Sequence, residues 1–296
     1  MFLVILLYLF FGISFTILKF LFNMTDPLTV TFWRLLIAGG FFIFFYFWRH
    51  RKWPKIKVKD RSLFFQFTLI AIYLTFTLGS WAVLYISSIK ACFYYNLAPF
   101  VTAIIAYFWY GRTLSIKKIA GIIVSFLGFI PYLRAAAQYE SESVFHAFIW
   151  LPDIAMALAV ISYAYGWLLI NELEKRGYAA ELINGVGMLA GSGLVLGTMM
   201  ITKTAIPIAE MSKFIALLLL LILVGNIIFY ALYSYLLHYY RPTFLSFMGI
   251  IAPLFAGFFG WIFLSEPIPP AFFVTIFIVA LGLFIFNYDE LMNVAS

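Results

Sequence analysis

Two basic residues, Lys19 and Arg34, lie inside long apolar stretches of the sequence, where a charged side chain is costly and usually has a function. Arg34 lies about two helical turns from the nearer end of its stretch, too far to extend easily into water. Lys19 lies within about one turn of an end, so its ammonium group can also reach polar surroundings. A cation facing a cavity would favour a carboxylate or phosphate on a bound molecule. The alternative for Arg34 is a structural role, through backbone carbonyls or Asp26.

Polar residues recur at helical spacing in two further apolar stretches. Asn226, Tyr230 and Ser234 follow one another at intervals of four residues, so they share one helix face. Ser80 and Trp81 lie on a similar face in an earlier stretch. An amide in apolar surroundings needs a partner, so Asn226 should point into the interior. These residues are candidates for substrate binding; the alternative is hydrogen bonding between helices.

Two prolines lie near the middle of apolar stretches. Tyr95 and Asn96 come about one turn before Pro99, and Pro253 lies in a later stretch. A proline inside a helix removes one backbone donor, frees a carbonyl group and bends the helix. In lipid, such backbone is tolerated only beside protein or a cavity. We therefore expect bends that line a cavity, with Tyr95 and Asn96 as candidate ligands; the alternative is bends that serve packing alone.

A pair of aromatic residues, Tyr163 and Trp167, stands four residues apart with a glycine between them. Such rings can stack on a planar ligand or hold a cation by cation–π attraction. Because 21% of the residues are aromatic, the alternative for any single ring is contact with lipid.

The residues that most enzymes need are missing from the pattern. Cys92 is the only cysteine, the three histidines lie far apart, and no nucleophile-elbow or H-E-x-x-H motif is present. No Asp or Glu lies near the centre of an apolar stretch, which disfavours proton antiport of a lipophilic cation. We expect no enzymatic activity, no cofactor and no bound metal.

A glycine-rich run at residues 184–197, "NGVGMLAGSGLVLG", superficially resembles a nucleotide-binding loop. It follows no strand and lies within an apolar stretch. Gly187 and Gly191, and then Gly193 and Gly197, form two faces of small residues, which predicts close helix packing on both.

Composition defines the elements that must position these residues. Of the 296 residues, 65% are hydrophobic and 10% charged, against roughly 45–50% and 25% in soluble domains. Soluble enzymes, DNA-binding domains and disordered proteins are excluded, and the chain is predicted to be all-α, a polytopic membrane protein with ten transmembrane helices. The predicted spans are 2–22, 28–48, 63–86, 91–110, 115–134, 148–171, 180–202, 213–238, 243–264 and 269–288.

Lysine and arginine are distributed unequally between the loops. With ten spans, the side that holds both termini carries thirteen of these residues and the opposite side carries four. The asymmetry predicts cytoplasmic termini in a cell inner membrane. The basic run at 49–61 is interpreted as contacting anionic membrane lipid, so we expect no nucleic-acid partner despite the net charge of +7.

The two halves of the sequence resemble each other. Shifting the chain by 154 residues places Ala98-Pro99 on Ala252-Pro253 and Gly128 on Gly282. The repeats would be residues 1–138, with spans 1–5, and residues 148–290, with spans 6–10. Because each repeat has an odd number of spans, the second is predicted to be inverted relative to the first, an arrangement common in secondary transporters.

The stretches "NLAPFVTAIIAYFWYGRTLSIKKIAGIIVSFLGF" and "IIAPLFAGFFGWIFLSEPIPPAFFVTIFIVALGLF" resemble the EamA repeat, which defines the ten-span drug/metabolite transporter superfamily. The second stretch matches the pattern with Pro253, Glu266 and Gly282. The first matches with Pro99 but has Arg112 where the glutamate usually stands. The resemblance covers nearly the whole chain and implies solute transport by alternating access.

The resemblance also narrows the solute. It implies a small polar metabolite, first an amino acid or its derivative, held in a cavity between spans 1, 3, 4, 6, 8 and 9. The alternative is S-adenosylmethionine, taken up or exchanged for S-adenosylhomocysteine, because a zwitterion with an aromatic base and a sulfonium suits an aromatic cavity without carboxylates. From another class, a membrane-embedded enzyme or scaffold is disfavoured. Whether the chain is a monomer or a homodimer is left open.

Overall fold

The computed structural model describes the chain apart from residues 52–54, 112, 141–149, 205–207, 209 and 293–296, and describes only the backbone of residues 110, 137, 139, 140, 150, 234 and 243. In the described part the regular structure is entirely helical. Ten helices are long and apolar enough to cross a membrane, which confirms the predicted number and class. Their ends fall within about five residues of the predicted spans.

Six of the ten spans are continuous helices. They are α1 (Phe2–Phe22), α2 (Pro27–His50), α7 (Ile116–Glu140), α8 (Trp150–Lys175), α9 (Ala180–Thr202) and α14 (Ala271–Met292). The N-terminus of α2 is capped by Asp26, whose side chain accepts a hydrogen bond of 2.8 Å from the backbone N–H of Leu28. Asp26 therefore serves as a helix cap and not as a partner of Arg34.

The other four spans, the third, fourth, eighth and ninth, are divided into shorter segments. The third consists of η1 (Val58–Asp60), α3 (Arg61–Gln66), the π-helical η2 (Phe67–Leu74) and α4 (Thr75–Tyr85), and the fourth of α5 (Ser88–Asn96) and α6 (Ala98–Tyr110). The eighth consists of α10 (Met211–Ile222), the π-helical η3 (Leu223–Ile228) and α11 (Phe229–Leu236), and the ninth of α12 (Pro242–Met248), the 3₁₀-helical η4 (Gly249–Ile251) and α13 (Ala252–Leu264).

The breaks in the fourth and ninth spans fall where the two prolines were singled out. Pro99 is the second residue of α6 and Pro253 the second residue of α13, positions at which the missing N–H is not needed. At the first break, the side-chain amide of Asn96 donates to the carbonyl oxygen of Cys92 at 3.0 Å.

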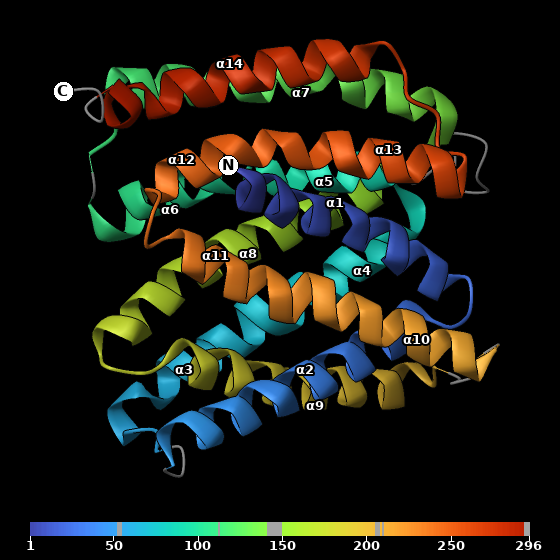
Figure 1. Ribbon diagram of the computed structural model, residues 1–296, viewed down its shortest axis with the longest axis vertical. Coiled ribbons are helices and arrows are strands. Elements are labelled where there is room, and N and C mark those ends of the chain that lie inside the picture. Colours follow the sequence, from blue (N-terminus) through green and yellow to red (C-terminus); the bar gives the residue numbers. More distant parts are fainter. Residues whose placement is uncertain (52–54, 112, 141–149, 205–207, 209, 293–296) are drawn as a thin grey trace.

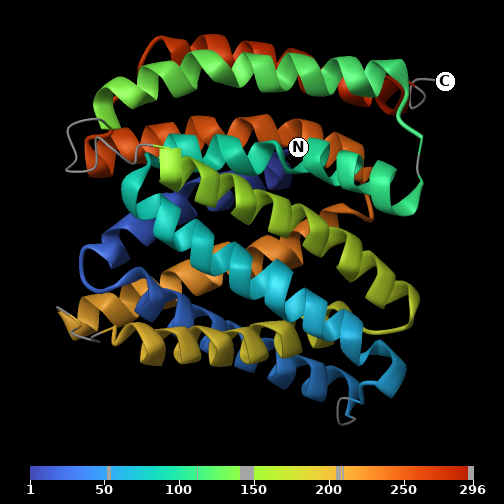
Figure 2. The same cartoon turned by 180° about the vertical axis from the view of Figure 1, so that it is seen from behind.

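The helices form layers that both views of the ribbon display (Figure 1, Figure 2). The pair α7 and α14 forms one edge of the bundle, and the pair α2 and α9 forms the opposite edge. Between them lie α1, α4, α5, α8, α11 and α13, which contribute half of the buried residues of the main hydrophobic cluster. The divided spans therefore occupy the interior of the molecule.

Glycines allow two of the helix pairs to pack closely. A Cβ atom on Gly121 of α7 would lie 2.6 Å from the carbonyl oxygen of Gly282 in α14. On α9, a Cβ on Gly187 would lie 2.5 Å from the ring of Phe67. The second predicted glycine face was wrong, because Gly193 and Gly197 have no atom within 4 Å of such a Cβ: this side of α9 lies at the edge of the bundle, away from other helices.

Candidate functional site

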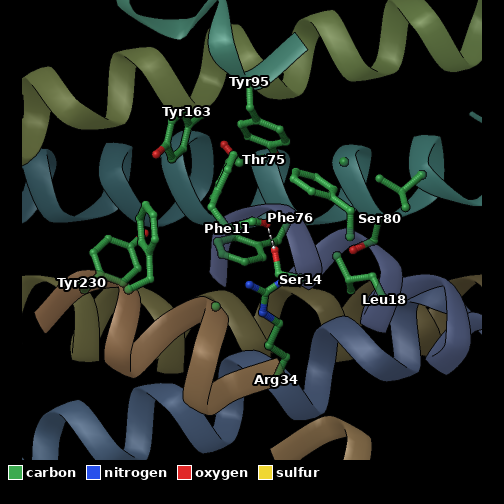
Figure 3. A pocket seen from close by; sticks show the side chains of 15 residues that line it. Phe11, Ser14, Leu18, Arg34, Thr75, Phe76, Ser80, Tyr95, Tyr163 and Tyr230 are labelled. Carbon is green, nitrogen blue, oxygen red and sulfur yellow. Dashed lines mark hydrogen bonds between the residues drawn. The ribbon is translucent and has the colours of Figure 1, made fainter. Parts of the chain in front are cut away.

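A pocket in the centre of the bundle contains the partly buried cation Arg34 and is called here the Arg34 cavity (Figure 3). About 660 Å³ of it, including space open to its surroundings, is free of protein atoms. Among the described residues that line it, Arg34 is the only charged one. The lining residues are Phe11, Ser14, Phe15, Leu18, Arg34, Thr75, Phe76, Gly79, Ser80, Val83, Tyr95, Tyr163, Gly225, Phe229 and Tyr230.

Arg34 is held in place by contacts from two other spans. Its Nε donates to Oδ1 of Asn226 at 2.8 Å, and its guanidinium carbon lies 4.9 Å from the ring centroid of Phe76. Figure 3 shows the side chain extending from α2 toward Ser14, with Tyr95 and Tyr163 across the cavity. These contacts orient the guanidinium group and leave the nitrogens at its tip directed at the cavity.

Asn226 lies in the π-helical segment η3 and is fully buried. While its carbonyl oxygen accepts from Arg34, its amide nitrogen Nδ2 has no hydrogen-bond partner in the described part of the chain. The preceding residue, Gly225, also faces the guanidinium, since a Cβ there would lie 3.3 Å from Nη2 of Arg34. The π-helical geometry thus places an amide and a glycine around one cation, and such segments often occur at functional sites.

A second pocket adjoins the first and is called the Trp167 cavity. It holds about 1000 Å³ free of protein atoms, and its lining includes Asn171 and Pro242, which are exposed. Both lie near the end of the bundle at which α8 ends and α12 begins, so the cavity opens toward that end. The lining residues are Tyr8, Phe11, Tyr95, Asn96, Ala98, Pro99, Thr102, Tyr163, Trp167, Asn171, Phe229, Tyr233, Pro242, Ser246 and Gly249.

Four aromatic residues line both cavities and are called the aromatic septum: Phe11, Tyr95, Tyr163 and Phe229. The ring centroids of Phe11 and Phe229 are 5.4 Å apart, those of Tyr95 and Tyr163 are 5.3 Å apart, and those of Phe11 and Tyr95 are 6.1 Å apart. Rings from spans 1, 4, 6 and 8 therefore meet between the two cavities.

Beyond the Arg34 cavity, buried polar contacts join the helices at one end of the bundle. Glu266 accepts from Lys19 Nζ at 2.6 Å and from the backbone N–H of Ser88 at 3.0 Å. We call Lys19, Ser88 and Glu266 the Glu266 cluster. Nearby, Lys90 Nζ lies 3.0 Å from a carboxylate oxygen of Asp153. Because these contacts connect α1, α5, α8 and the segment that follows α13, they close this end.

At the opposite end, Asp60 is fully buried and accepts from Arg176 at 2.6 Å and from the hydroxyl of Tyr178 at 2.7 Å. Hydrogen bonds to Asp60 and Glu172 raise the pKa of Arg176 above its usual value, so it stays charged. Burial is the main reason that the pKa of Tyr178 is raised, so its hydroxyl remains a donor. This cluster anchors the start of the third span without crossing the Trp167 cavity.

Most of the residues singled out from the sequence line one cavity or the other. Those on the Arg34 cavity are Arg34, Ser80, Tyr95, Tyr163 and Tyr230, and those on the Trp167 cavity are Tyr95, Asn96, Pro99, Tyr163 and Trp167. Asn226 contacts the first cavity through Arg34.

The remaining candidates are placed differently. Lys19 pairs with Glu266 and is not among the lining residues of either cavity. Trp81 also lies outside both linings and packs on Tyr85, with ring centroids 5.1 Å apart. Pro253 is buried in α13, and the side chain of Ser234 lies outside the described residues.

The first span was expected to line the cavity, but its lining side chains other than Lys19 were not singled out from the sequence, and Lys19 itself is not among them. Phe11, Ser14, Phe15 and Leu18 all line the Arg34 cavity, at offsets of three, four and seven residues. This spacing is one helix face, but in a span apolar on every side it does not stand out. Phe76 was missed because only the fold brings it beside Arg34.

Ten apolar helices, two cavities in the bundle and a partly buried cation define a multi-pass membrane protein with a site for a small solute. The model of the EamA-like transporter family matches residues 1–133 and 150–288, so the chain belongs to this family. The match twice along the chain confirms the resemblance read from the EamA motifs. The inverted orientation of the two repeats stays a prediction.

Curated relatives carry a specific name. The S-adenosylmethionine/S-adenosylhomocysteine transporter of Chlamydia muridarum (strain MoPn / Nigg) is 28% identical over 94% of this chain and 88% of its own length. The protein of the same name from Chlamydia trachomatis serovar L2 is 27% identical over 94% of this chain and 85% of its length. A solved crystal structure aligns with a TM-score of 0.63 at 16% identity, covering 97% of this chain and 95% of that one, which supports the fold alone.

Proposed function

We propose that this protein exchanges S-adenosylmethionine for S-adenosylhomocysteine by alternating access, in a cell inner membrane with both termini in the cytoplasm. The observation that carries the proposal is the similarity, over nearly the whole chain, to transporters named for this pair of solutes. The inner membrane and the orientation are supported by the unequal distribution of lysine and arginine between the loops.

The chemistry of the two cavities supports the same solutes. S-adenosylmethionine carries an adenine ring, a sulfonium cation and an amino-acid group. The larger Trp167 cavity offers aromatic faces for a base and the amides of Asn96 and Asn171 for its edge. The aromatic septum offers ring faces to the sulfonium, and the Arg34 cavity offers a cation to the carboxylate.

A free amino acid is the weaker candidate. It would occupy the Arg34 cavity but leave the larger aromatic cavity unfilled, and the curated relatives are named for the adenosyl compounds. In the proposed orientation the Glu266 cluster faces outward and the Trp167 cavity opens to the cytoplasm, so the structure corresponds to an inward-facing form. A solute that reaches both cavities requires the rings of the septum to rotate apart.

Counterflow in liposomes tests this proposal. Vesicles containing the purified chain are loaded with unlabelled S-adenosylhomocysteine, and labelled S-adenosylmethionine is added outside without an ion gradient. We expect transient accumulation of label above that in protein-free vesicles, and the same with S-adenosylmethionine inside. Accumulation of a labelled free amino acid in matched vesicles, without any accumulation of labelled S-adenosylmethionine, would refute the adenosyl assignment.

A further inference from the structure

We infer that Arg34 and Asn226 together form a carboxylate-binding site that selects solutes by the charge of their amino-acid end. The inference rests on the proposed function for the identity of the solute, but the site itself is argued from the contacts around the guanidinium group.

Arg34 has unused hydrogen-bonding capacity directed at the cavity. Its Nε is occupied by Asn226, while its two terminal nitrogens make no hydrogen bond or ion pair in the part of the chain that the structure describes. A guanidinium presents these nitrogens as a planar fork whose spacing matches the two oxygens of a carboxylate. Because a charged group away from water is stabilised strongly by an opposite charge, an anionic ligand should bind these free nitrogens more tightly than a neutral one.

The composition of the cavity limits the charge of that ligand. Arg34 is the only charged residue in the described part of the lining, so one negative charge on the ligand balances the site. A phosphate dianion would leave one charge uncompensated beside rings of Phe and Tyr. The hydroxyl of Ser14 is already used, since it donates to the carbonyl of Phe11 at 2.6 Å. A single carboxylate fits this site better than a phosphate.

Asn226 is a positioning residue, because it acts on the ligand through Arg34. Its oxygen holds Nε and so directs the free edge of the guanidinium at the cavity. An aspartate here would keep the shape and the acceptor but would neutralise Arg34 from behind. The neutral amide at position 226 therefore leaves the positive charge available, and its buried, unpartnered Nδ2 is a cost that an aspartate would avoid.

The site predicts discrimination between S-adenosylmethionine and its decarboxylated analogue. The two share the base, the sugar and the sulfonium and differ in the carboxylate, so their net charges are +1 and +2. Charge-assisted hydrogen bonds to the carboxylate should make the parent compound bind about 10- to 100-fold more tightly. The analogue would bring two uncompensated positive charges near Arg34.

The test measures how well each compound competes with labelled S-adenosylhomocysteine for the purified full-length chain. We expect the preference for the carboxylate in the wild type and its loss in both Arg34→Gln and Asn226→Asp. Arg49→Gln is the matched control, because Arg49 pairs with Glu181 at the surface with 63% of its side chain exposed, and it should behave as the wild type. If Arg34→Gln fails to fold, Asn226→Asp and Arg34→Lys still decide the question, the latter with a weakened preference.

The results separate this inference from the proposed function. Equal competition by both compounds, or an unchanged preference in Asn226→Asp, would overturn the carboxylate site while leaving transport of S-adenosylmethionine intact. If the wild type binds neither adenosyl compound, amino acids are compared with their matching amines by thermal stabilisation. A preference for the amino acid that Arg34→Gln abolishes would support the site without the proposed function, and no preference for any pair would overturn it.

Discussion

The substitution Glu266→Gln should raise the fraction of molecules in which the closed end of the bundle is open. In the proposed cycle, access from that end requires the Glu266 cluster to separate. Glutamine keeps the shape and one acceptor for Ser88 but loses the charge that Lys19 contacts at 2.6 Å. A hydrogen bond between charged groups is worth roughly 1.5–3 kcal/mol, and because the Lys19 side chain is 21% exposed, we take about 2 kcal/mol.

That free energy sets the size of the effect. Since 1.4 kcal/mol is a factor of ten, a loss of 2 kcal/mol raises the ratio of open to closed forms roughly 30-fold. A reporter thiol at Val83→Cys measures this ratio, because Val83 lines the Arg34 cavity and is 2% exposed. Cys92, which is fully buried, is replaced by alanine so that only the reporter reacts.

The assay is the rate at which a membrane-impermeant maleimide, added on the Glu266 side of proteoliposomes, labels the reporter. When opening is fast relative to labelling, the rate follows the open population and should rise by the same factor of about 30. Glu290→Gln is the control, since Glu290 pairs with Lys118 at the other end and is 42% exposed. An unchanged rate in Glu266→Gln, or an equal rise in the control, would refute the reasoning.

With the predicted inversion of the two repeats, the sequence counterpart of this contact would fall at the other end of the bundle. A shift of 154 residues pairs Glu266 with Arg112 and Ser88 with Pro242. An arginine cannot accept the hydrogen bonds of a carboxylate, and a proline has no N–H to donate. The two ends of the bundle are therefore chemically different, and the resting form should be closed at the Glu266 end.

Three further substitutions test the packing and the site. Gly121→Ala should destabilise the fold by about 1–3 kcal/mol and so lower its melting temperature in detergent, because the added Cβ would clash with α14. Gly40→Ala is the control, since no atom lies within 4 Å of its added Cβ, and it should leave the melting temperature unchanged. Tyr178→Phe should destabilise the fold by about 1–3 kcal/mol, because it removes a donor from the buried carboxylate of Asp60; a melting temperature equal to that of the wild type would contradict this. Trp167→Ala should weaken S-adenosylhomocysteine binding roughly 5- to 150-fold through lost stacking, and Trp167→Phe should restore most of it, as measured by competition.

Much of the fold could be predicted from the sequence because the membrane restricts the choices. Apolar stretches of about 20 residues can only be helices in lipid, so the number of spans and their bounds followed directly. Pro99 and Pro253 marked the breaks in the fourth and ninth spans, since proline removes a backbone donor and crowds the preceding turn, although α7 continues through Pro131. The π-helical segments of the third and eighth spans carried no such signal and were not predicted.

The site was predictable in its residue types but not in its contacts. Buried amides, tyrosines and a cation must find partners in lipid, so Arg34, Tyr95, Tyr163 and Asn226 were candidates from the sequence alone. Trp81 is also an aromatic side chain with a hydrogen-bond donor, yet the orientation of α4 leaves it outside both cavities. Helical spacing shows which residues share a face but does not show which way that face points.

What the sequence by itself determined is therefore the helical membrane fold, the repeated EamA pattern and a scarcity of carboxylates in the spans. Only the tertiary structure decided that Arg34 meets Asn226, 192 residues away, and that Lys19 meets Glu266, 247 residues away. Composition depends on each residue alone, whereas the partner of a buried charge depends on how all ten helices pack. For this reason one cation closes an end of the bundle and the other faces the cavity.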